Sequence, residues 1–569
     1  MMNNSTARLD TSLNRFVLCI RKSAMIDDIA LKVLQRRYLA RDEAGVPVET
    51  VEDMFRRVAG HVAGSDRSRD EVSRGRISDI YFRMMNDLEF LPNSPTLMNA
   101  GRELGQLAAC FVLPVEDSLD SIFASVSDTA KIHQSGGGTG FSFSRLRPKG
   151  DIVRSTMGAA SGPVSFIRVF NMATEVIKQG GTRRGANMGI LRVDHPDIEE
   201  FAAIKTDPGE LTNFNLSVAV TDAFFGSCRE DTLFPLVNPR NNETVRTVRA
   251  LSLLDLIAQC AWASGEPGLI FIDTINRANP TPHLGPIEAT NPCGEQPLLP
   301  YEPCCLGSID CAKMVRLGRI DYDRLKVIVH DAVRFLDDTI DAGRYPIEAI
   351  RDMARANRKI GLGVMGFAHM LIKLGIPYDS GEAVTAARDL MYFINSESKA
   401  ASRELAEERG VFPNYRGSIW DRKGLPLRNA TTTTIAPTGT LSILAGTSSG
   451  IEPVYDIAYS RMLFGGLRVE VTDPLYKEMN GIVGPDRLKT LFRKAGDVAP
   501  EWHLAVQKAF QDHVDNAVSK TINLGAAAAP DDIRSIYFKA WEMGLKGITV
   551  FRDTSRDSQV LSCRTQQTC

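Results

Sequence analysis

The sequence contains no run of about 18 consecutive apolar residues, the length that an α-helix needs to cross a bilayer. Residues 1–10 are polar and lack the apolar core of a signal peptide. The charges nearly balance, with a formal net charge of -2, so the composition gives no support for binding to nucleic acid. We therefore expect a cytoplasmic protein that has neither a membrane nor a nucleic acid as its partner.

The remaining composition is that of an ordinary enzyme. Hydrophobic residues make up 43% and charged residues 24% of 569 positions, a length that allows one large α/β domain with appendages or three small domains. In a reducing compartment, ten cysteines argue against structural disulfides and for catalytic, redox or metal-binding roles. No spacing of His, Cys and carboxylate residues is typical of a fixed metal site, so we predict none.

One short stretch concentrates reactive side chains. It reads Asn291-Pro292-Cys293-Gly294-Glu295-Gln296 and is followed by Cys304-Cys305. A thiol lies two residues from a carboxylate and two from an amide, and proline and glycine favour a turn that aims all three from one loop. The stretch predicts a catalytic loop.

The order of apolar and polar segments suggests three parts. Residues 1–90 predict a small helical region, and residues 91–553 alternate strand and helix patterns as in an α/β domain. Residues 554–569 are polar without a packing pattern, which predicts a flexible tail.

Two strands are expected to carry further candidates. Ala108–Leu113 predicts a buried strand, in which Cys110 by itself favours a core cysteine. Thr431–Ala436 predicts another strand, followed by the turn Pro437-Thr438-Gly439-Thr440 into a helix. Backbone N–H groups at such a turn suit a phosphate, although a bare strand-to-helix turn is the alternative. The turn lacks the lysine of an ATP-binding loop, so hydrolysis of a nucleotide is not implied.

A helix pair and its loops form another candidate. Asp117-Ser118 is expected to begin a helix that ends at a glycine run, Gly136–Gly140. Between residues 145 and 187, two basic, glycine-rich loops flank a second helix, Pro163–Lys178. Mobile loops with arginines suit phosphates and bases, whereas a capped helix with solvated basic ends is the plainer interpretation.

The motif Asn291-Pro292-Cys293-Gly294-Glu295, with Cys304 eleven residues after Cys293, resembles the large catalytic subunit of ribonucleotide reductases, and the match runs in order across most of the chain. The resemblance implies a ten-stranded α/β barrel of two half-barrels with a central finger loop, preceded by a small helical region. It also implies reduction of ribonucleotides to 2'-deoxyribonucleotides by a thiyl radical. Nothing in residues 1–90 resembles the ATP-sensing domain that the family often carries.

The resemblance assigns roles residue by residue. It makes Cys293 the thiyl site, Glu295 the acceptor of the 3'-hydroxyl proton, Asn291 a hydrogen-bonding partner, and Cys110 with Cys304 the reducing dithiol. Cys305 would point to the opposite face of a strand. The implied substrate-binding residues are Ser94, Thr96, Ala109, Pro437, Thr438, Gly439 and Thr440. The implied effector-binding residues are Asp117, Ser118, Lys149, Arg183 and Arg184. Cys563 and Cys569 would shuttle electrons from a thioredoxin-like reductant, unless they are an incidental pair in a flexible end.

The origin of the radical distinguishes the classes of this family. No Tyr-Tyr pair occurs anywhere, and Val550-Phe551 stands where class I subunits carry one. A glycyl radical motif is absent too, and Glu295 is foreign to class III. The resemblance therefore points to class II and its cofactor adenosylcobalamin. We expect diphosphate substrates, deoxynucleotide effectors and a homodimer. The alternatives are a class I large subunit that needs a radical-generating partner, and a dNTP-binding protein without catalysis.

Overall fold

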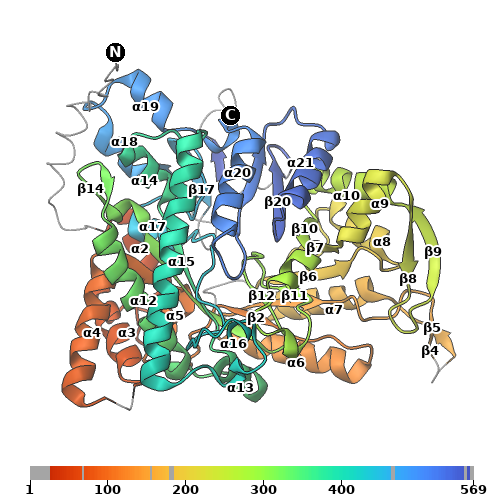
Figure 1. Ribbon diagram of the computed structural model, residues 1–569, viewed down its shortest axis with the longest axis horizontal. Helices are drawn as coiled ribbons and strands as arrows, with labels where there is room; N and C mark the ends of the chain where they lie inside the picture. The colour runs from red at the N-terminus through yellow and green to blue at the C-terminus, as the bar shows by residue number, and fades with distance from the viewer. Residues whose placement is uncertain are drawn as a thin grey trace.

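The computed structural model describes residues 26–66, 69–153, 157–177, 185–462, 468–555 and 561–563. It shows the predicted α/β architecture, in which helices surround a large sheet and further helices pack at the N-terminal side (Figure 1). Within these ranges, no helix is long and apolar enough to cross a membrane.

The N-terminal region is helical, as predicted. Its helices are α2 (Asp28–Arg37), α3 (Val51–Ala63), α4 (Glu71–Asn86) and α5 (Ser94–Asn99). Helix α3 begins with a capping box, because the Thr50 side chain accepts from the Asp53 N–H and the Asp53 side chain accepts from the Thr50 N–H. Its apolar side chains, including Met54, Val58 and Val62, are buried in the common core of the protein.

The first half of the barrel consists of parallel strands in the order β2 (Cys110–Val112), β3 (Gly138–Ser142), β6 (Asn187–Arg192), β7 (Phe214–Val220) and β10 (Gly268–Phe271). Connecting helices include α6 (Leu119–Gln134), α7 (Pro163–Val176), α8 (Ile198–Ala203), α9 (Asp222–Glu230) and α10 (Ala250–Ser264). Most strand residues are buried, as expected for parallel strands covered on both faces.

The second half contains β13 (Pro303–Asp310), β16 (Ile360–Met365), β19 (Thr521–Leu524) and β20 (Gly547–Arg552). Its helices include α12 (Tyr322–Ala342), α13 (Glu348–Asn357), α14 (Phe367–Leu374), α15 (Gly381–Arg409), α20 (Pro500–Gln511) and α21 (Pro530–Glu542). Residues 431–435 complete this half. Thr433 bridges to Leu362 of β16, and Ile435 bridges to Val518, just before β19, both in parallel orientation. The expected strand at Thr431–Ala436 is thus an extended segment held by two bridges.

The halves join antiparallel to one another. Strand β13 pairs with β2 at one junction, and β10 pairs with β20 at the other. Five strands in each half, counting residues 431–435, confirm the predicted ten-stranded barrel. The short strand β1 (Phe90–Pro92) lies beside the ring, where it pairs with β13.

Of the C-terminal tail, the structure describes residues 554–555 and 561–563, and the last three form a strand. Leu561–Cys563 forms β21, which pairs antiparallel with β17 (Ala458–Met462). Strand β18 (Arg468–Thr472) pairs with the other edge of β17. Backbone pairing at an open strand edge needs no apolar side-chain pattern, which is why the polar sequence does not reveal this strand.

Buried charges fasten the N-terminal region to the barrel. The Arg409 guanidinium, at the end of α15, contacts the carboxylates of Asp66, Asp337 and Asp338 at 2.6 to 3.1 Å. The Tyr81 hydroxyl of α4 donates to Asp338 at 2.6 Å. The carboxylates are buried and the Arg409 side chain is 12% exposed, so removal of the arginine would leave unpaired charges in the core.

Candidate active site

The predicted catalytic loop is the tip of a hairpin. Strands β11 (Ala289–Thr290) and β12 (Pro297–Leu298) pair antiparallel, and residues 291–296 connect them. The Gly294 N–H donates to the Asn291 carbonyl at 3.0 Å, which closes a β-turn with Pro292 and Cys293 at its centre. Gly294 has a φ of +80°, a conformation that favours glycine. The turn leaves the Cys293 side chain exposed.

This finger loop is held on both sides by the barrel. At Gly140 of β3, a Cβ atom would lie 1.7 Å from the Thr290 carbonyl oxygen, so only glycine allows this approach. On the other side, the Glu295 carbonyl accepts from the Ala517 N–H and the Thr434 hydroxyl, both at 2.9 Å. The finger loop therefore runs between the two half-barrels, as the central finger of the prediction.

Cys110 and Cys304 face each other across the junction of the halves. They are direct partners in the antiparallel pairing of β2 with β13. Both are free thiols and are 4% and 1% exposed. Burial raises the pKa of each thiol well above its usual range. Two thiols on adjacent strands, separated by most of the first half-barrel in sequence, can close to a disulfide with little backbone movement.

Asn291 and Glu295 lie beside this pair. The Asn291 side-chain amide donates to Cys110 Sγ at 3.1 Å, while its Oδ1 accepts from the Gln296 N–H at 2.9 Å. After burial, the Glu295 carboxylate is the next largest cause that raises the pKa of Cys110, followed by Cys304 and Cys293. The structure thus brings together all five predicted catalytic residues, namely Asn291, Cys293, Glu295, Cys110 and Cys304.

Cys305 belongs to a different environment from Cys304. Cys110 and Cys304 lie in one apolar cluster inside the barrel, whereas Cys305 lies in the outer core between the sheet and the helices. Burial raises the pKa of Cys305 to about 12. The expected alternation of the two side chains across the strand agrees with this placement.

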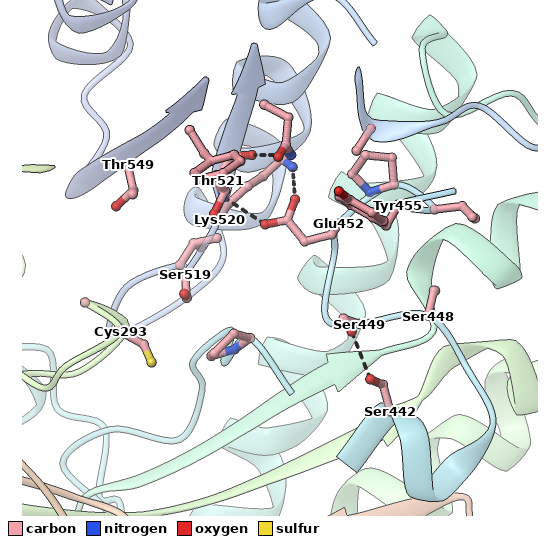
Figure 2. Close-up of a pocket in the computed structure, with 18 of the residues that line it drawn as sticks. Cys293, Ser442, Ser448, Ser449, Glu452, Tyr455, Ser519, Lys520, Thr521 and Thr549 are labelled. Carbon is pink, nitrogen blue, oxygen red and sulfur yellow. Dashed lines mark hydrogen bonds and ion pairs between the residues drawn. The ribbon is translucent and has the colours of Figure 1, made fainter. Parts of the chain in front are cut away.

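A cavity of about 600 Å³ opens beside Cys293. Figure 2 shows the thiol at one side of the cavity and hydroxyl groups around it. The lining includes Ser442, Ser448, Ser449, Tyr455, Ser519, Thr521 and Thr549. The Lys520 ammonium pairs with Glu452, whose other oxygen accepts from the Thr521 N–H at 2.8 Å. The volume is in the range of sites for small molecules and cofactors.

The predicted phosphate turn lies at this cavity. Pro437 lines it, and the turn leads into α17 (Leu441–Ala445). The Thr438 hydroxyl accepts from the Gly450 N–H at 2.7 Å, which ties the turn to the following loop. Gly439 and Thr440 stand between these anchored positions and the helix.

The other predicted substrate contacts are less well placed. Thr96 is fully buried, and its hydroxyl donates to the Leu107 carbonyl at 2.9 Å, so the structure does not bring it to the cavity. Ser94 is hydrogen bonded to the Tyr38 hydroxyl at 2.7 Å. The Ala109 N–H donates to the Cys304 carbonyl at 3.3 Å, which places Ala109 beside the pair of Cys110 and Cys304.

Three of the predicted effector residues are described, and they lie near the N-terminal ends of α6 and α7. The Arg147 guanidinium contacts Asp117 at 2.9 Å, and Ser118 caps α6. Lys149 is exposed and contacts Glu200 at 3.3 Å. Arg183, Arg184 and Cys569 lie outside the residues that the structure describes, and of Cys563 only the backbone pairing is described.

Sequence reasoning missed a buried ion pair near Cys304. Lys359 Nζ lies 2.6 Å from Glu302 Oε2, and both side chains are 1% exposed. Glu302 comes just before a proline at the start of β13, and Lys359 just before β16. Neither stands in a motif, because only the pairing of the two strands brings them together. In the described part of the chain, no group of three or more metal-ligating side chains is found.

Comparison with known proteins agrees with this geometry. A family model described as "Ribonucleotide reductase, barrel domain" matches residues 108–427 and 423–551. A second, "Ribonucleotide reductase, all-alpha domain", matches residues 25–105, beyond the boundary expected at residue 90. The match covers the finger loop, Cys110, Cys304 and the ring of strands.

Individual relatives agree as well. A protein of Mycobacterium tuberculosis named "Vitamin B12-dependent ribonucleoside-diphosphate reductase" is 49% identical over 98% of this chain and 83% of its own length. A protein of the same name from Thermoplasma acidophilum is 46% identical over 95% of this chain and 80% of its own length. A "Ribonucleoside-diphosphate reductase subunit alpha" of Chlamydia pneumoniae is 26% identical over 98% of this chain and 62% of its own length. The chain therefore belongs to the large-chain family of ribonucleotide reductases.

Proposed function

We propose that the chain reduces ribonucleoside diphosphates to 2'-deoxyribonucleoside diphosphates, with a radical that depends on adenosylcobalamin. Two relatives named as vitamin B12-dependent ribonucleoside-diphosphate reductases are 46% and 49% identical to it. Other relatives named for vitamin B12 dependence are 28% and 29% identical, and the relative named as an alpha subunit is 26% identical. The absence of a Tyr-Tyr pair from the sequence supports the same class.

The observation that carries the proposal is the position of Cys293. Its exposed thiol stands at the tip of the finger loop, between the cavity and the buried pair of Cys110 and Cys304. A thiol in this position can exchange a hydrogen atom with a substrate on one side and meet a radical source on the other. Glu295 and Asn291 come from the same loop, so one turn positions the whole set.

The cavity residues fit a cobalamin cofactor. Such a group needs space beside the thiol and hydrogen-bonding partners for its amide edges, and the cavity supplies serine and threonine hydroxyls around an apolar floor. When bound, adenosylcobalamin supplies an organic radical close to Cys293.

Five residues of the chain would carry out the transfer of the hydrogen atom, the protons and the electrons. Cys293 removes the hydrogen atom from the 3'-carbon of the ribose and returns it at the end of the cycle. Glu295 accepts the proton of the 3'-hydroxyl, and Asn291 hydrogen-bonds the substrate or orients that carboxylate. Cys110 and Cys304 deliver two electrons and two protons in total, the 2'-hydroxyl departs as water, and the pair ends as a disulfide.

Regeneration requires an external dithiol. Cys563 and Cys569 in the C-terminal tail would pass electrons from a thioredoxin-like reductant to this disulfide by thiol exchange. The backbone of β21 carries Cys563 to the edge of β17, whose Tyr459 lines the cavity. A cytoplasmic location would keep all of these thiols reduced.

The remaining proposed contacts concern nucleotides and assembly. Pro437, Thr438, Gly439 and Thr440, with Ser94, would hold substrate phosphates, and Asp117, Ser118, Lys149, Arg183 and Arg184 would bind a deoxynucleotide effector. A homodimer through α6 and α7 is supported by their exposed apolar side chains. These are Leu119, Phe123, Met172 and Val176, each more than half exposed.

The test uses the purified chain alone. It is incubated with a ribonucleoside diphosphate, a deoxynucleotide effector and dithiothreitol, with and without adenosylcobalamin, and the deoxynucleotide formed is measured. We expect product only with the cofactor, and none from Cys293→Ser. Product that appears only after addition of a metal-containing partner protein would instead indicate a class I enzyme.

A further inference from the structure

A buried lysine lies beside one member of the reducing pair. Strand β16 pairs in parallel with β13, and Cys305 is the partner of Ile360. One residue earlier on each strand, Cys304 and Lys359 are therefore neighbours whose side chains leave the sheet on the same face. That face is the inner one, because Cys305 and Ile360 both belong to the outer core.

Lys359 is paired with Glu302, and that carboxylate also accepts hydrogen bonds from two other groups. Glu302 accepts from the Lys359 ammonium at 2.6 Å, from the Leu299 N–H at 2.6 Å and from the Asn357 side-chain amide. Glu302 is also the only partner that we find for Lys359 Nζ in the described ranges, although an ammonium group carries three N–H donors. A positive charge with unused donors thus remains next to Cys304.

The surroundings of the two sulfurs are unequal in charge. Near Cys110 lie the Glu295 carboxylate and the Cys293 thiol, and the neutral Asn291 amide is its hydrogen-bond donor. Near Cys304, burial raises the thiol pKa most and Cys305 adds to it, while the Lys359 ammonium lowers it against the smaller effects of Glu302 and Glu295. Glu295 thus acts on both thiols, and only Cys304 has a cation among its neighbours that shift its pKa. A full charge stabilises a thiolate more than a neutral amide does, so Cys304 is the better leaving group.

We propose that Lys359, held in place by Glu302, sets the direction in which the Cys110–Cys304 disulfide is reduced. An incoming thiolate forms a bond with Cys110 Sγ, the Sγ–Sγ bond breaks, and its electron pair leaves on Cys304 as a thiolate beside the ammonium. A second thiol of the dithiol reductant then attacks the mixed disulfide and releases Cys110. Two electrons pass from the reductant to the pair, and each released thiolate takes up a proton.

This inference rests on the proposed role of Cys110 and Cys304 as the reducing pair, and its test separates the two. The full chain with Cys563→Ser and Cys569→Ser, which prevents attack by its own tail, is oxidised with diamide and exposed briefly to 2-mercaptoethanol. The mixture is quenched with acid and alkylated, and the adduct is located by peptide mass spectrometry. We expect at least about tenfold more adduct on Cys110 than on Cys304.

Variants of the ion pair complete the test. Replacement of both partners, Glu302→Gln with Lys359→Gln, leaves no unpaired buried charge, and we expect it to lower the preference for Cys110 to below about threefold. Lys359→Arg keeps the positive charge and should retain the preference for Cys110. Adduct mainly on Cys304, or an unchanged preference in the double variant, would overturn the inference alone. A separate measurement tests the reducing pair itself. If the chain turns over substrate without an external reductant and the Cys110–Cys304 disulfide does not form, the proposed reducing pair is wrong, and this inference fails with it.

Discussion

The Asn291 side-chain amide donates to Cys110 Sγ at 3.1 Å, across a separation of 181 residues. This contact joins the tip of the finger loop to the first strand of the barrel. It means that the positions of Cys293 and of the pair of Cys110 and Cys304 are set together, since a shift of the finger loop would move Asn291 away from Cys110.

The two adjacent cysteines of β13 should differ sharply in function. Cys304→Ala should abolish multiple turnovers with dithiothreitol, because the pair can no longer form a disulfide. Cys305→Ala, in the outer core, should keep its activity and lose about 1–2 kcal/mol of unfolding free energy from the cavity it leaves. Deoxynucleotide assays and urea unfolding of both variants check this, and loss of activity in Cys305→Ala alone would reverse our assignment.

The glycine against the finger loop should be essential for its position. In Gly140→Ala the new methyl group would lie 1.7 Å from the Thr290 carbonyl oxygen, so the finger loop must move. Displacement by about 1 Å is expected to lower the turnover rate by about 100-fold. Gly226→Ala on α9 is the matched control, because nothing lies within 4 Å of its added Cβ. Full activity in Gly140→Ala would show that the finger loop tolerates the shift.

The stability that Asp338 contributes at the junction of the N-terminal region and the barrel should depend on pH. Burial raises the pKa of Asp338 to about 6, against the opposing effect of Arg409. Between about pH 4 and 6, the Asp338 carboxyl therefore holds a proton in the folded protein that it has released in the unfolded chain. Its contribution to stability falls as the pH rises through this window, by up to about 3 kcal/mol.

Asp338→Asn should remove this contribution to the pH dependence. Urea unfolding across the window measures the slope, with the exposed Asp352→Asn as control. Equal slopes in wild type and Asp338→Asn would mean that the carboxyl of Asp338 is already ionised at the lower end of the window.

The exposed apolar side chains of α6 and α7 should mediate self-association. Phe123→Glu or Met172→Glu places a charge in this surface, and we expect a monomer where the wild type forms a dimer. Light scattering after size-exclusion chromatography measures the mass. Tyr392→Glu, which changes an exposed side chain of α15, should leave it unaltered. A wild-type monomer at all concentrations would contradict the proposed homodimer.

Local features of the site could be predicted well from the sequence. Proline and glycine around Cys293 indicate the turn directly. The apolar stripe between Asp321 and Ala342 predicts a helix over these residues, and α12 spans Tyr322–Ala342. Both depend on residues that are close in the chain, where backbone preferences and periodicity decide the structure.

Long-range relations could not be worked out in this way. The pairing of Cys110 with Cys304 was expected only from the family resemblance, and the Glu302–Lys359 pair was not expected at all. Thr96 is an example of the opposite kind. A threonine in a turn-rich loop is compatible with a ligand contact, yet the Thr96 hydroxyl donates to the Leu107 carbonyl inside the core. Such outcomes depend on which strands become neighbours.

The bonds from the finger loop to residues 434 and 517 have a consequence for folding. The Glu295 carbonyl accepts from Thr434 and Ala517, which lie in the segments that bridge the second half of the ring. The strands of the second half pair with one another directly, but the Ala517 N–H finds its acceptor only when the finger loop is in place. Contacts so distant in sequence form late and slowly. We therefore expect that a chain with a misplaced finger loop is less protected against proteases around residues 434 and 517.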